Sequence, residues 1–392
     1  MNTKSNSNRA KLDSVEGVRG IACFMVLLSH LSLIFFPFLH GENASQIKTI
    51  IEPSIYSLPL GFVYSGTAAV YIFFCLSGFI LTYACSNKGS PLDNAAKMLS
   101  YRYIRLALPT FTSILICSLI IYFFKESANG LPWISGYGAN ASLELFDILY
   151  NALFSAVITG DNTYNWVVWT MQIELFGSIL IFMAVPLLNK FKHTWLILII
   201  LGFIVIINIP TKAGYGYAAF LFGSSLYYAP SIKNNLFTFV LFFAGFYFGG
   251  FHYKQDAYSS LIAFSNNIFD TSAINYYYFY NMLSGILVVS ALIKSNVFNW
   301  LSSNIVSVWL GKVSFSAYLI QMPVYLVISP LQPHIATLVG GSYLLSAILT
   351  CVLCIFVIYI LSIVFYELID KKSILLSKKG IALIRKHNQV AC

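Results

Sequence analysis

Charged side chains are scarce in this sequence. Only 9% of its 392 residues are Asp, Glu, Lys or Arg, and 58% are hydrophobic, whereas about 25% of the residues in soluble proteins are charged. No soluble fold can bury so much apolar surface, so most of that surface must face lipid. The aromatic content, with 33 Phe, 26 Tyr and 6 Trp, is typical of membrane proteins with interfacial belts. The composition predicts a polytopic membrane protein.

Long polar segments and phosphate-binding motifs are also lacking. No loop approaches the roughly 100 residues of an independent catalytic domain, and neither a Walker loop nor a G-x-G-x-x-G after a strand occurs. The 7 cysteines provide no disulfide framework, and the C-x-x-C formed by Cys351 and Cys354 lies in an apolar run, which argues against a metal or redox site. Any catalytic site must therefore be built from membrane spans and their ends, and we expect no metal and no bound cofactor.

Apolar runs of about 20 residues, the length that crosses a bilayer, recur along the whole chain. They predict an all-α bundle of about ten transmembrane helices in one domain over 1–392, with short cytoplasmic tails at 1–14 and 370–392. The first run is too long for a cleavable signal peptide and has no small-residue cleavage site after it. The predicted spans are 18–39, 64–85, 104–124, 166–188, 195–209, 215–230, 236–251, 278–294, 314–331 and 343–366.

The basic residues favour one orientation of these spans. With the N-terminus inside, the outer segments hold only four of the 23 Lys and Arg residues, namely Lys48, Lys125, Lys212 and Lys254, and the inner segments hold the rest. An excess of Lys and Arg on the cytoplasmic side is the main sequence signal of orientation. The net charge of +9 is therefore a topology signal, nucleic acid is not expected as a partner, and both termini are predicted to be cytoplasmic.

The stretch "RGIACFMVLLSH" places two ionisable residues, Arg19 and His30, in the first apolar run. His30 lies about 16 Å along the helix from Arg19. An ionisable residue within a membrane span is a functional hypothesis that calls for a partner, and Glu174 lies at a similar predicted depth in "WTMQIELFGSIL". A carboxylate beside an imidazole fixes the tautomer and raises the basicity of the ring. The alternatives are structural: an interfacial anchor for Arg19 and a helix-bridging hydrogen bond for His30.

A second basic pair lies in "YRYIRLALP", where Arg102 and Arg105 are separated by one helical turn at the inner start of the third span. Positions i and i+3 share a helix face, and guanidinium groups bind phosphate oxygens bidentately. Together with Arg19 these residues are predicted to hold a phosphate-rich cytoplasmic ligand with a long arm, the shape of a coenzyme A thioester. The alternative is a positive-inside belt.

These stretches resemble the acyltransferase family 3 membrane proteins. The likeness begins with "LDSVEGVRGIACFMVLLSH" and continues through "YIFFCLSGFILT", "YRYIRLALPT", "WTMQIELFGSIL", "LGKVSFSAYLIQMPV" and "FYELIDKK", in the family's order over nearly the whole chain. Two positions depart from the family pattern: Gln321 stands where many members carry histidine, and the proline that follows the last glutamate is missing. The fused extracytoplasmic hydrolase-like domain of some relatives is not expected here.

The resemblance implies an O-acyltransferase of the bacterial inner membrane. Such an enzyme moves an acyl group, usually acetyl, from cytoplasmic acyl-CoA, a co-substrate, to a hydroxyl of a surface polysaccharide such as O-antigen or capsule, or of a lipid-linked glycan. His30 would act as a general base or as a transient acyl carrier, and Glu174 would orient it. Arg19, Arg102 and Arg105 would bind the donor. Trp133 and Tyr137, in the loop at about 125–165, are candidate stacking residues for the acceptor.

Two other classes remain open. A transporter or flippase would account for buried charges and many spans, but the sequence has no internal repeat and no matching pair of Gly- or Pro-interrupted spans. A polysaccharide polymerase would require a larger outer loop.

Overall fold

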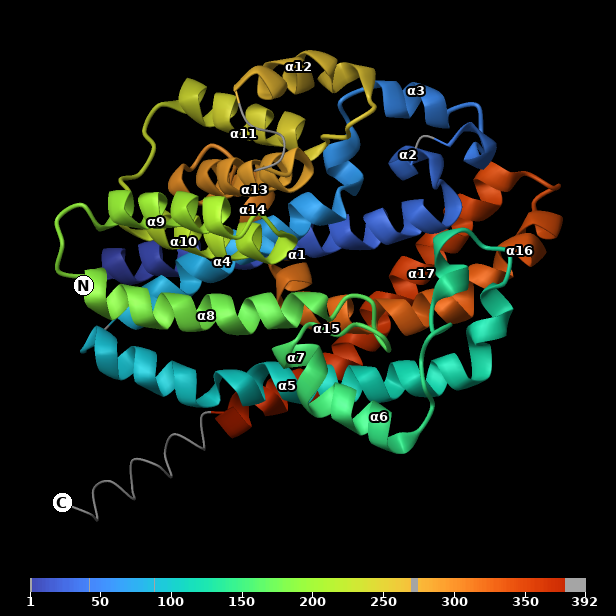
Figure 1. Cartoon of the computed structure of the whole chain (residues 1–392), viewed down its shortest axis with the longest axis horizontal. Coiled ribbons are helices and arrows are strands. Elements are labelled where there is room, and N and C mark those ends of the chain that lie inside the picture. Colours follow the sequence, from blue (N-terminus) through green and yellow to red (C-terminus); the bar gives the residue numbers. More distant parts are fainter. Residues whose placement is uncertain (1, 42, 88, 269–273, 378–392) are drawn as a thin grey trace. The chain divides into compact units, whose positions relative to one another are not determined.

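The computed structural model describes residues 2–41, 43–87, 89–268 and 274–377, with side chains from Leu12 onward, and this part of the chain is helical without a strand. A helix occurs at each of the ten predicted spans (Figure 1). These helices are α1 (Asn2–Phe35), α4 (Gly66–Ser86), α5 (Pro91–Phe124), α8 (Trp169–Leu188), α9 (Thr194–Asn208), α10 (Lys212–Tyr228), α11 (Asn235–Gly249), α13 (Tyr276–Lys294), α15 (Ile305–Ile328) and α17 (Tyr343–Phe365).

Seven apolar helical segments within the described residues are long enough to cross a membrane, as expected for a multi-pass membrane protein. They are Leu12–Phe35, Gly66–Ser86, Pro91–Ala128, Trp169–Leu188, Tyr276–Lys294, Ile305–Leu338 and Tyr343–Ser377. The other three helices, α9, α10 and α11, have only 15, 17 and 15 residues, fewer than the roughly 20 that a perpendicular span requires. The all-α class is confirmed, and the count of ten spans stays a prediction.

The number of crossings has a testable consequence for the termini, because ten crossings return the chain to its starting side and seven do not. We expect topology reporters placed after Gly41, Lys88, Asn140 and Cys392 to read outside, inside, outside and inside. Lys88 and Cys392 lie outside the described residues. An outside reading at Cys392 would contradict the ten-span topology.

Short helices connect the long ones or cap their ends. Several carry large exposed apolar side chains, such as Phe146 and Leu145 on α6. The short α-helices are α2 (Phe38–Gly41), α3 (Glu52–Ser57), α6 (Leu145–Tyr150), α7 (Ala156–Ile158), α12 (Ser259–Ile268), α14 (Asn299–Ser302) and α16 (Gln332–Leu338). Two π-helical segments, η5 (Asn151–Ser155) and η8 (Tyr366–Asp370), continue α6 and α17. The 3₁₀ segments are Ala44–Gln46, Gly61–Tyr64, Lys125–Ala128, Trp133–Gly136, Asp256–Tyr258 and Ser329–Leu331.

The chain forms two compact units, each assembled from separate stretches. The first comprises residues 1–80, 192–315 and 341–347. In it α9 packs against α10, and α13 packs against α11, α10 and α1 (Figure 1). Small residues allow close approach between helices: a Cβ added at Gly223 of α10 would lie 1.9 Å from the carbonyl oxygen of Cys75 of α4. Such glycine contacts replace the hydrophobic driving force that is missing between helices in lipid.

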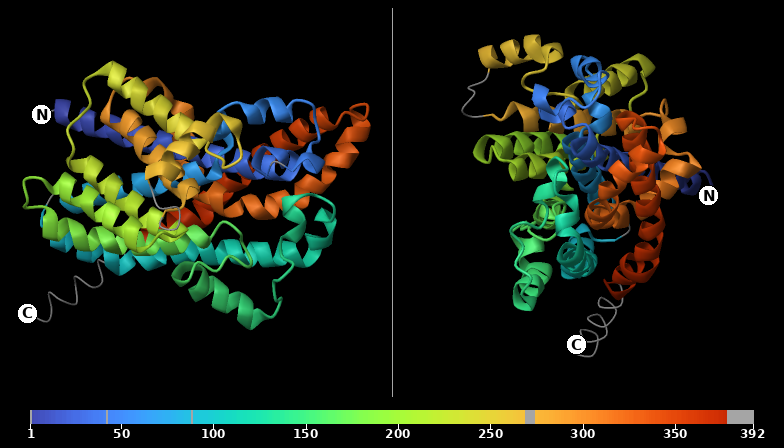
Figure 2. Two further views of the ribbon diagram at one scale, coloured as in Figure 1. Left: turned by 45° about the horizontal axis from the view of Figure 1, so that its top comes forward. Right: turned by 90° about the vertical axis from the view of Figure 1, so that its right-hand side faces the viewer.

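The second unit comprises residues 81–191, 316–340 and 348–392. Its centre is the pair α5 and α8, which run side by side (teal and green in Figure 2). The segments η5 and η8 also pack against α5. The helix α5 contains 34 residues and is long enough for both its charged N-terminal half and its apolar C-terminal half to have neighbours in this unit. Its ionisable residues lie in the charged half.

Candidate functional site

The predicted site residues divide between the two units. Arg19 and His30 both lie on α1 in the first unit, and the others belong to the second unit. Each set is therefore described within its own unit, and the pairing of His30 with Glu174 stays a prediction. The residues of the second set are Arg102, Arg105, Trp133, Tyr137 and Glu174.

Arg19 does not lie at the start of its helix. The helix α1 begins at Asn2 and its apolar segment at Leu12, so Arg19 lies about 10 Å inside that segment. Its guanidinium Nη1 is 3.3 Å from Oε1 of Glu16 one turn earlier, and both side chains are about one-third exposed. Such a partly solvated pair contributes little to stability. Among the described residues, this ion pair engages Nη1 of Arg19 and leaves its other donors available to a ligand.

The opposite end of α1 carries two histidines. His30, which is half-buried, lies five residues before the end of the helix, and His40 follows in α2. Ser32 connects His40 to the backbone of α1: its hydroxyl donates to the carbonyl of Ser29 at 2.8 Å and lies 2.7 Å from Nε2 of His40. Which of the two groups donates in the Ser32–His40 contact depends on the tautomer of His40.

Burial, together with the nearby His252 and His30, lowers the pKa of His40 to about 3. His40 is therefore neutral at physiological pH. His30 and His252 lie close enough to His40 to act electrostatically on its ring. The ring centroids of His40 and His252 are 6.2 Å apart. His30 is thus one of three neighbouring imidazoles.

In the second unit Arg102 and Glu174 form an ion pair. Nη2 of Arg102 lies 2.7 Å from Oε2 of Glu174 on α8, and Nε of Arg102 donates to Oγ of Ser178 at 2.7 Å. Ser178 in turn donates to the carbonyl oxygen of Glu174. The side chains of Arg102 and Glu174 are only 16% and 15% exposed, so each charge depends on the other for compensation.

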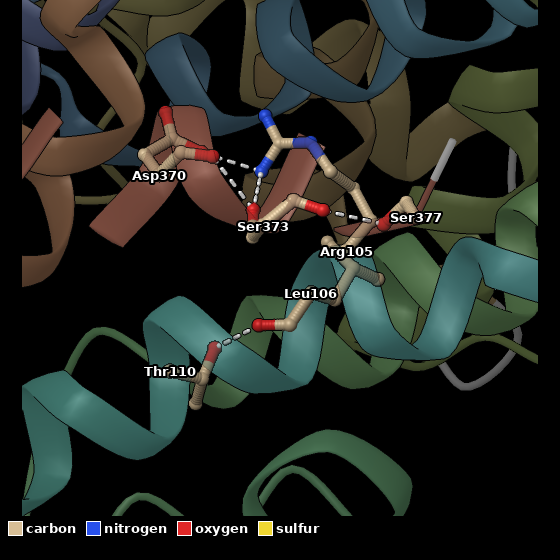
Figure 3. Close-up of polar contacts among 6 residues, drawn as sticks. All are labelled: Arg105, Leu106, Thr110, Asp370, Ser373 and Ser377. Carbon is tan, nitrogen blue, oxygen red and sulfur yellow. Dashed lines mark hydrogen bonds and ion pairs between the residues drawn. The ribbon is translucent and has the colours of Figure 1, made fainter. Parts of the chain in front are cut away.

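Arg105, one turn later on α5, is held by a different element. Its Nη1 lies 2.5 Å from Oδ1 of Asp370 and donates to Oγ of Ser373 at 3.2 Å, in the segment that continues α17 (Figure 3). Ser373 donates to the carbonyl of Asp370 at 2.8 Å, and Ser377 donates to that of Ser373 at 2.6 Å. The carboxylate of Asp370 is 3% exposed. The end of α17 is thereby attached to α5.

These two ion pairs correct the predicted arrangement of the arginines. Their i, i+3 spacing predicted a common face turned toward one phosphate, but Arg102 is directed to α8 and Arg105 to η8 and the turn after it. The physical reason is the low-dielectric surroundings, where a guanidinium is strongly stabilised by a carboxylate within reach. The helix that contains the predicted third span, 104–124, begins earlier, at Pro91.

The proposed acceptor residues of the loop at about 125–165 have structural contacts. Tyr137 is 1% exposed and its hydroxyl donates to the carbonyl of Tyr164 at 2.7 Å. The ring of Trp166 packs edge-on against both Tyr137 and Trp133, at 5.2 and 5.0 Å between centroids. The expectation that Tyr137 offers a stacking surface is therefore wrong: its ring is used to anchor the loop. Trp133 is only half-buried, so its role stays a prediction.

Gln321, which departs from the family pattern, is fully buried in α15. Its amide Nε2 donates to the carbonyl of Tyr318 at 2.8 Å, and the Tyr325 hydroxyl donates to its Oε1 at 3.5 Å. The nearby hydroxyl of Tyr318 donates to the carbonyl of Val167 at 2.9 Å. The amide therefore meets its hydrogen-bonding needs without a charge.

Sequence reasoning missed three residues of these clusters: Asp370, His40 and His252. Asp370 was detectable as an acidic residue at the end of the longest apolar run, in "ELIDKK". His40 and His252 follow helix ends, where polar residues are common, and no spacing in the sequence relates either of them to His30.

Comparison with known proteins agrees with the resemblance. Residues 12–367 match the model of a family described as an acyltransferase domain, Acyl_transf_3. In an alignment of 204 positions the sequence is 26% identical to the O-acetyltransferase PaAT-1 of Phomopsis amygdali, and the match covers 43% of this chain and 39% of that protein's length. No solved structure matches. Because the family match covers nearly the whole chain and includes Arg19, His30, Arg102, Arg105 and Glu174, the chain belongs to the acyltransferase family 3.

Proposed function

We propose that this protein is an O-acyltransferase of the bacterial inner membrane. It transfers an acyl group, acetyl in the first instance, from cytoplasmic acyl-CoA to a hydroxyl of a surface polysaccharide or a lipid-linked glycan. Family membership supports the reaction class, and the partial similarity to an O-acetyltransferase supports acetyl as the group.

The observation that carries the proposal is the arrangement of α1. It holds Arg19 about 16 Å from His30 on one rigid helix, and His30 is near the end of an apolar span. An imidazole titrates near neutral pH and suits proton transfer. A phosphate-bearing donor bound at Arg19 would extend its thioester arm toward His30.

In the simplest route His30 removes the proton of the acceptor hydroxyl as its oxygen attacks the thioester carbonyl carbon. The carbon–sulfur bond breaks, the ester carbon–oxygen bond forms, and the coenzyme A thiolate takes up the proton from His30. In the second route the imidazole nitrogen attacks first, releases the thiol and carries the acyl group to the hydroxyl. Both routes consume one acyl-CoA and one hydroxyl and produce one ester and one thiol.

Mass analysis of the envelope glycans tests the function. Cells with the gene should carry glycan masses increased by an acyl group, and these species should disappear on its deletion and return with the wild-type gene but not with a His30→Gln variant. Unchanged glycan masses, combined with altered export of a glycan, would favour the transporter or flippase that the buried charges also allow.

The arginines should affect donor binding more than chemistry. We expect Arg19→Lys and Arg105→Lys to raise the KM for acetyl-CoA by about ten- to a hundredfold, because lysine keeps the charge and loses the bidentate fork; one hydrogen bond to a charged group contributes about 1.5–3 kcal/mol. Initial rates at varied donor concentration measure this. Lys371→Ala, a change to an exposed basic residue, is the matched control and should leave the donor KM unchanged. Unaltered donor KM in both arginine variants would assign these residues to an interfacial belt.

A further inference from the structure

Polar aromatic side chains gather where several helices of the first unit end. The helices α1 and α11 end at Phe35 and Gly249, and α10, α4 and α13 begin at Lys212, Gly66 and Tyr276. Contacts show that these ends form one layer: the Tyr277 hydroxyl lies 3.0 Å from Oγ1 of Thr67, and the Tyr71 hydroxyl donates to the carbonyl of Lys212 at 3.3 Å. Ends of membrane helices are where polar ligands can be reached from water.

Four side chains in this layer, three joined by ring contacts and the fourth by a hydrogen bond, form what we call the histidine–tyrosine row: His40, His252, Tyr253 and Tyr277. The ring centroids of His40 and His252 are 6.2 Å apart, and those of His252 and Tyr277 are 6.0 Å apart. The backbone N–H of Tyr277 donates to the hydroxyl of Tyr253 at 3.2 Å. Three separate stretches of chain thus hold the row together.

The row combines apolar ring faces with neutral hydrogen-bonding groups. Tyr253 is 49% exposed, and His40, His252 and Tyr277 are half-buried. Its side chains include no carboxylate, and His40 is neutral, so that its ring has one donor and one acceptor nitrogen. A ligand with both a C–H face and several hydroxyl groups matches these features, because ring faces bind apolar surface and ring edges exchange hydrogen bonds. A neutral sugar ring has that chemistry.

The row also has a defined position relative to His30. His30 lies about 8 Å before the end of α1, and it is close enough to act electrostatically on His40. Arg19 lies toward the opposite end of the same helix. A hydroxyl held at the row would therefore approach His30 from the side opposite to a donor bound at Arg19.

We propose that the histidine–tyrosine row is the acceptor subsite, which binds a neutral sugar ring of the glycan and directs one of its hydroxyl groups toward His30. The inference rests on the proposed function for its role in transfer, but the binding of sugar can be measured without any transfer.

The binding experiment uses the full chain purified into lipid nanodiscs and saturation-transfer NMR. The probes are the methyl glycosides of glucose, galactose, rhamnose and N-acetylglucosamine at millimolar concentration. At least one should receive saturation from the wild-type protein, and His252→Ala and Tyr253→Ala should weaken its binding by about threefold to tenfold, the effect of one aromatic contact. Tyr150→Ala is the matched control, because Tyr150 is 56% exposed and lies in the second unit. Tyr253→Phe keeps the ring and should retain most of the binding.

Kinetics provides the second measurement. His252→Ala and Tyr253→Ala should raise the KM for glycan acceptor and leave the KM for acetyl-CoA unchanged. Equal saturation in wild type and row variants, or no saturation of any probe, would overturn the subsite. A different result would separate the two proposals. If the wild-type protein transfers no acyl group but binds sugar, and the row variants lose that binding, the proposed function is refuted and the binding site is retained.

Discussion

Replacing His30 with glutamine should reduce acyl transfer by about 10²–10⁴-fold, the usual contribution of a general acid–base group. Glutamine keeps a side chain able to bridge helices by hydrogen bonds, but it cannot accept a proton or carry an acyl group at a ring nitrogen. The measurement is the rate of acetyl incorporation into envelope glycan, together with the affinity for acetyl-CoA. We expect the donor affinity to be retained, because Arg19 is unchanged.

Several controls separate chemistry from folding in this experiment. The His30→Gln protein should reach the membrane in the same amount as the wild type, and His30→Ala should be equally inactive. Near-normal transfer by His30→Gln would show that the histidine is a structural bridge. An acylated histidine recovered from the wild type by rapid quenching and peptide mass analysis would select the covalent route. Glu174→Gln should have intermediate activity if Glu174 supports the imidazolium form of His30.

The second large effect is expected on stability, from the ion pair of Arg102 and Glu174. Arg102→Leu removes the guanidinium that lies 2.7 Å from a carboxylate exposed by only 15%. Breaking a buried pair by removing one partner costs about 3–5 kcal/mol, because the remaining charge loses its compensation. The free energy of unfolding, measured with SDS in bicelles, should fall by this amount.

The double variant Arg102→Leu/Glu174→Leu is the decisive control. It removes both charges, so its free energy of unfolding should lie closer to that of the wild type than the Arg102→Leu value does. Simple addition of the two single effects would show that the charges are not coupled. The double variant also separates two roles of Arg102: if it folds normally but its KM for acetyl-CoA is raised, Arg102 binds the donor as well as stabilising α8.

Some features of this protein depend only on local sequence. The scarcity of charge and the apolar runs predicted an all-α membrane bundle, and a helix occurs at each predicted span. Both features follow from the requirement that a backbone in lipid satisfy its own hydrogen bonds. The spacing of Arg19 and His30 on one helix is equally local, because the rise per residue fixes it.

The partners of the charged groups could not be predicted in the same way. Arg102 bonds to Glu174 and Ser178, and Arg105 bonds to Asp370, 265 positions away in the chain. No local pattern encodes such a separation, since the choice of carboxylate depends on which helices pack together and on the cost of leaving a charge uncompensated. The same is true of Tyr137, whose burial depends on Tyr164 and Trp166 across the loop.

The sequence by itself therefore determined the class of the protein and its helical segments, and it supplied the hypothesis that His30 and Glu174 take part in acyl transfer. Composition and residue periodicity report on single helices, and the helical segments and the spacing of residues along them are properties of single helices. Only the tertiary structure decided that the arginines of α5 separate toward two acidic partners, and that His40, His252 and Tyr277 meet beside the end of α1. These arrangements arise from packing between helices far apart in the chain, where burial makes every polar group depend on a partner that the local sequence does not specify.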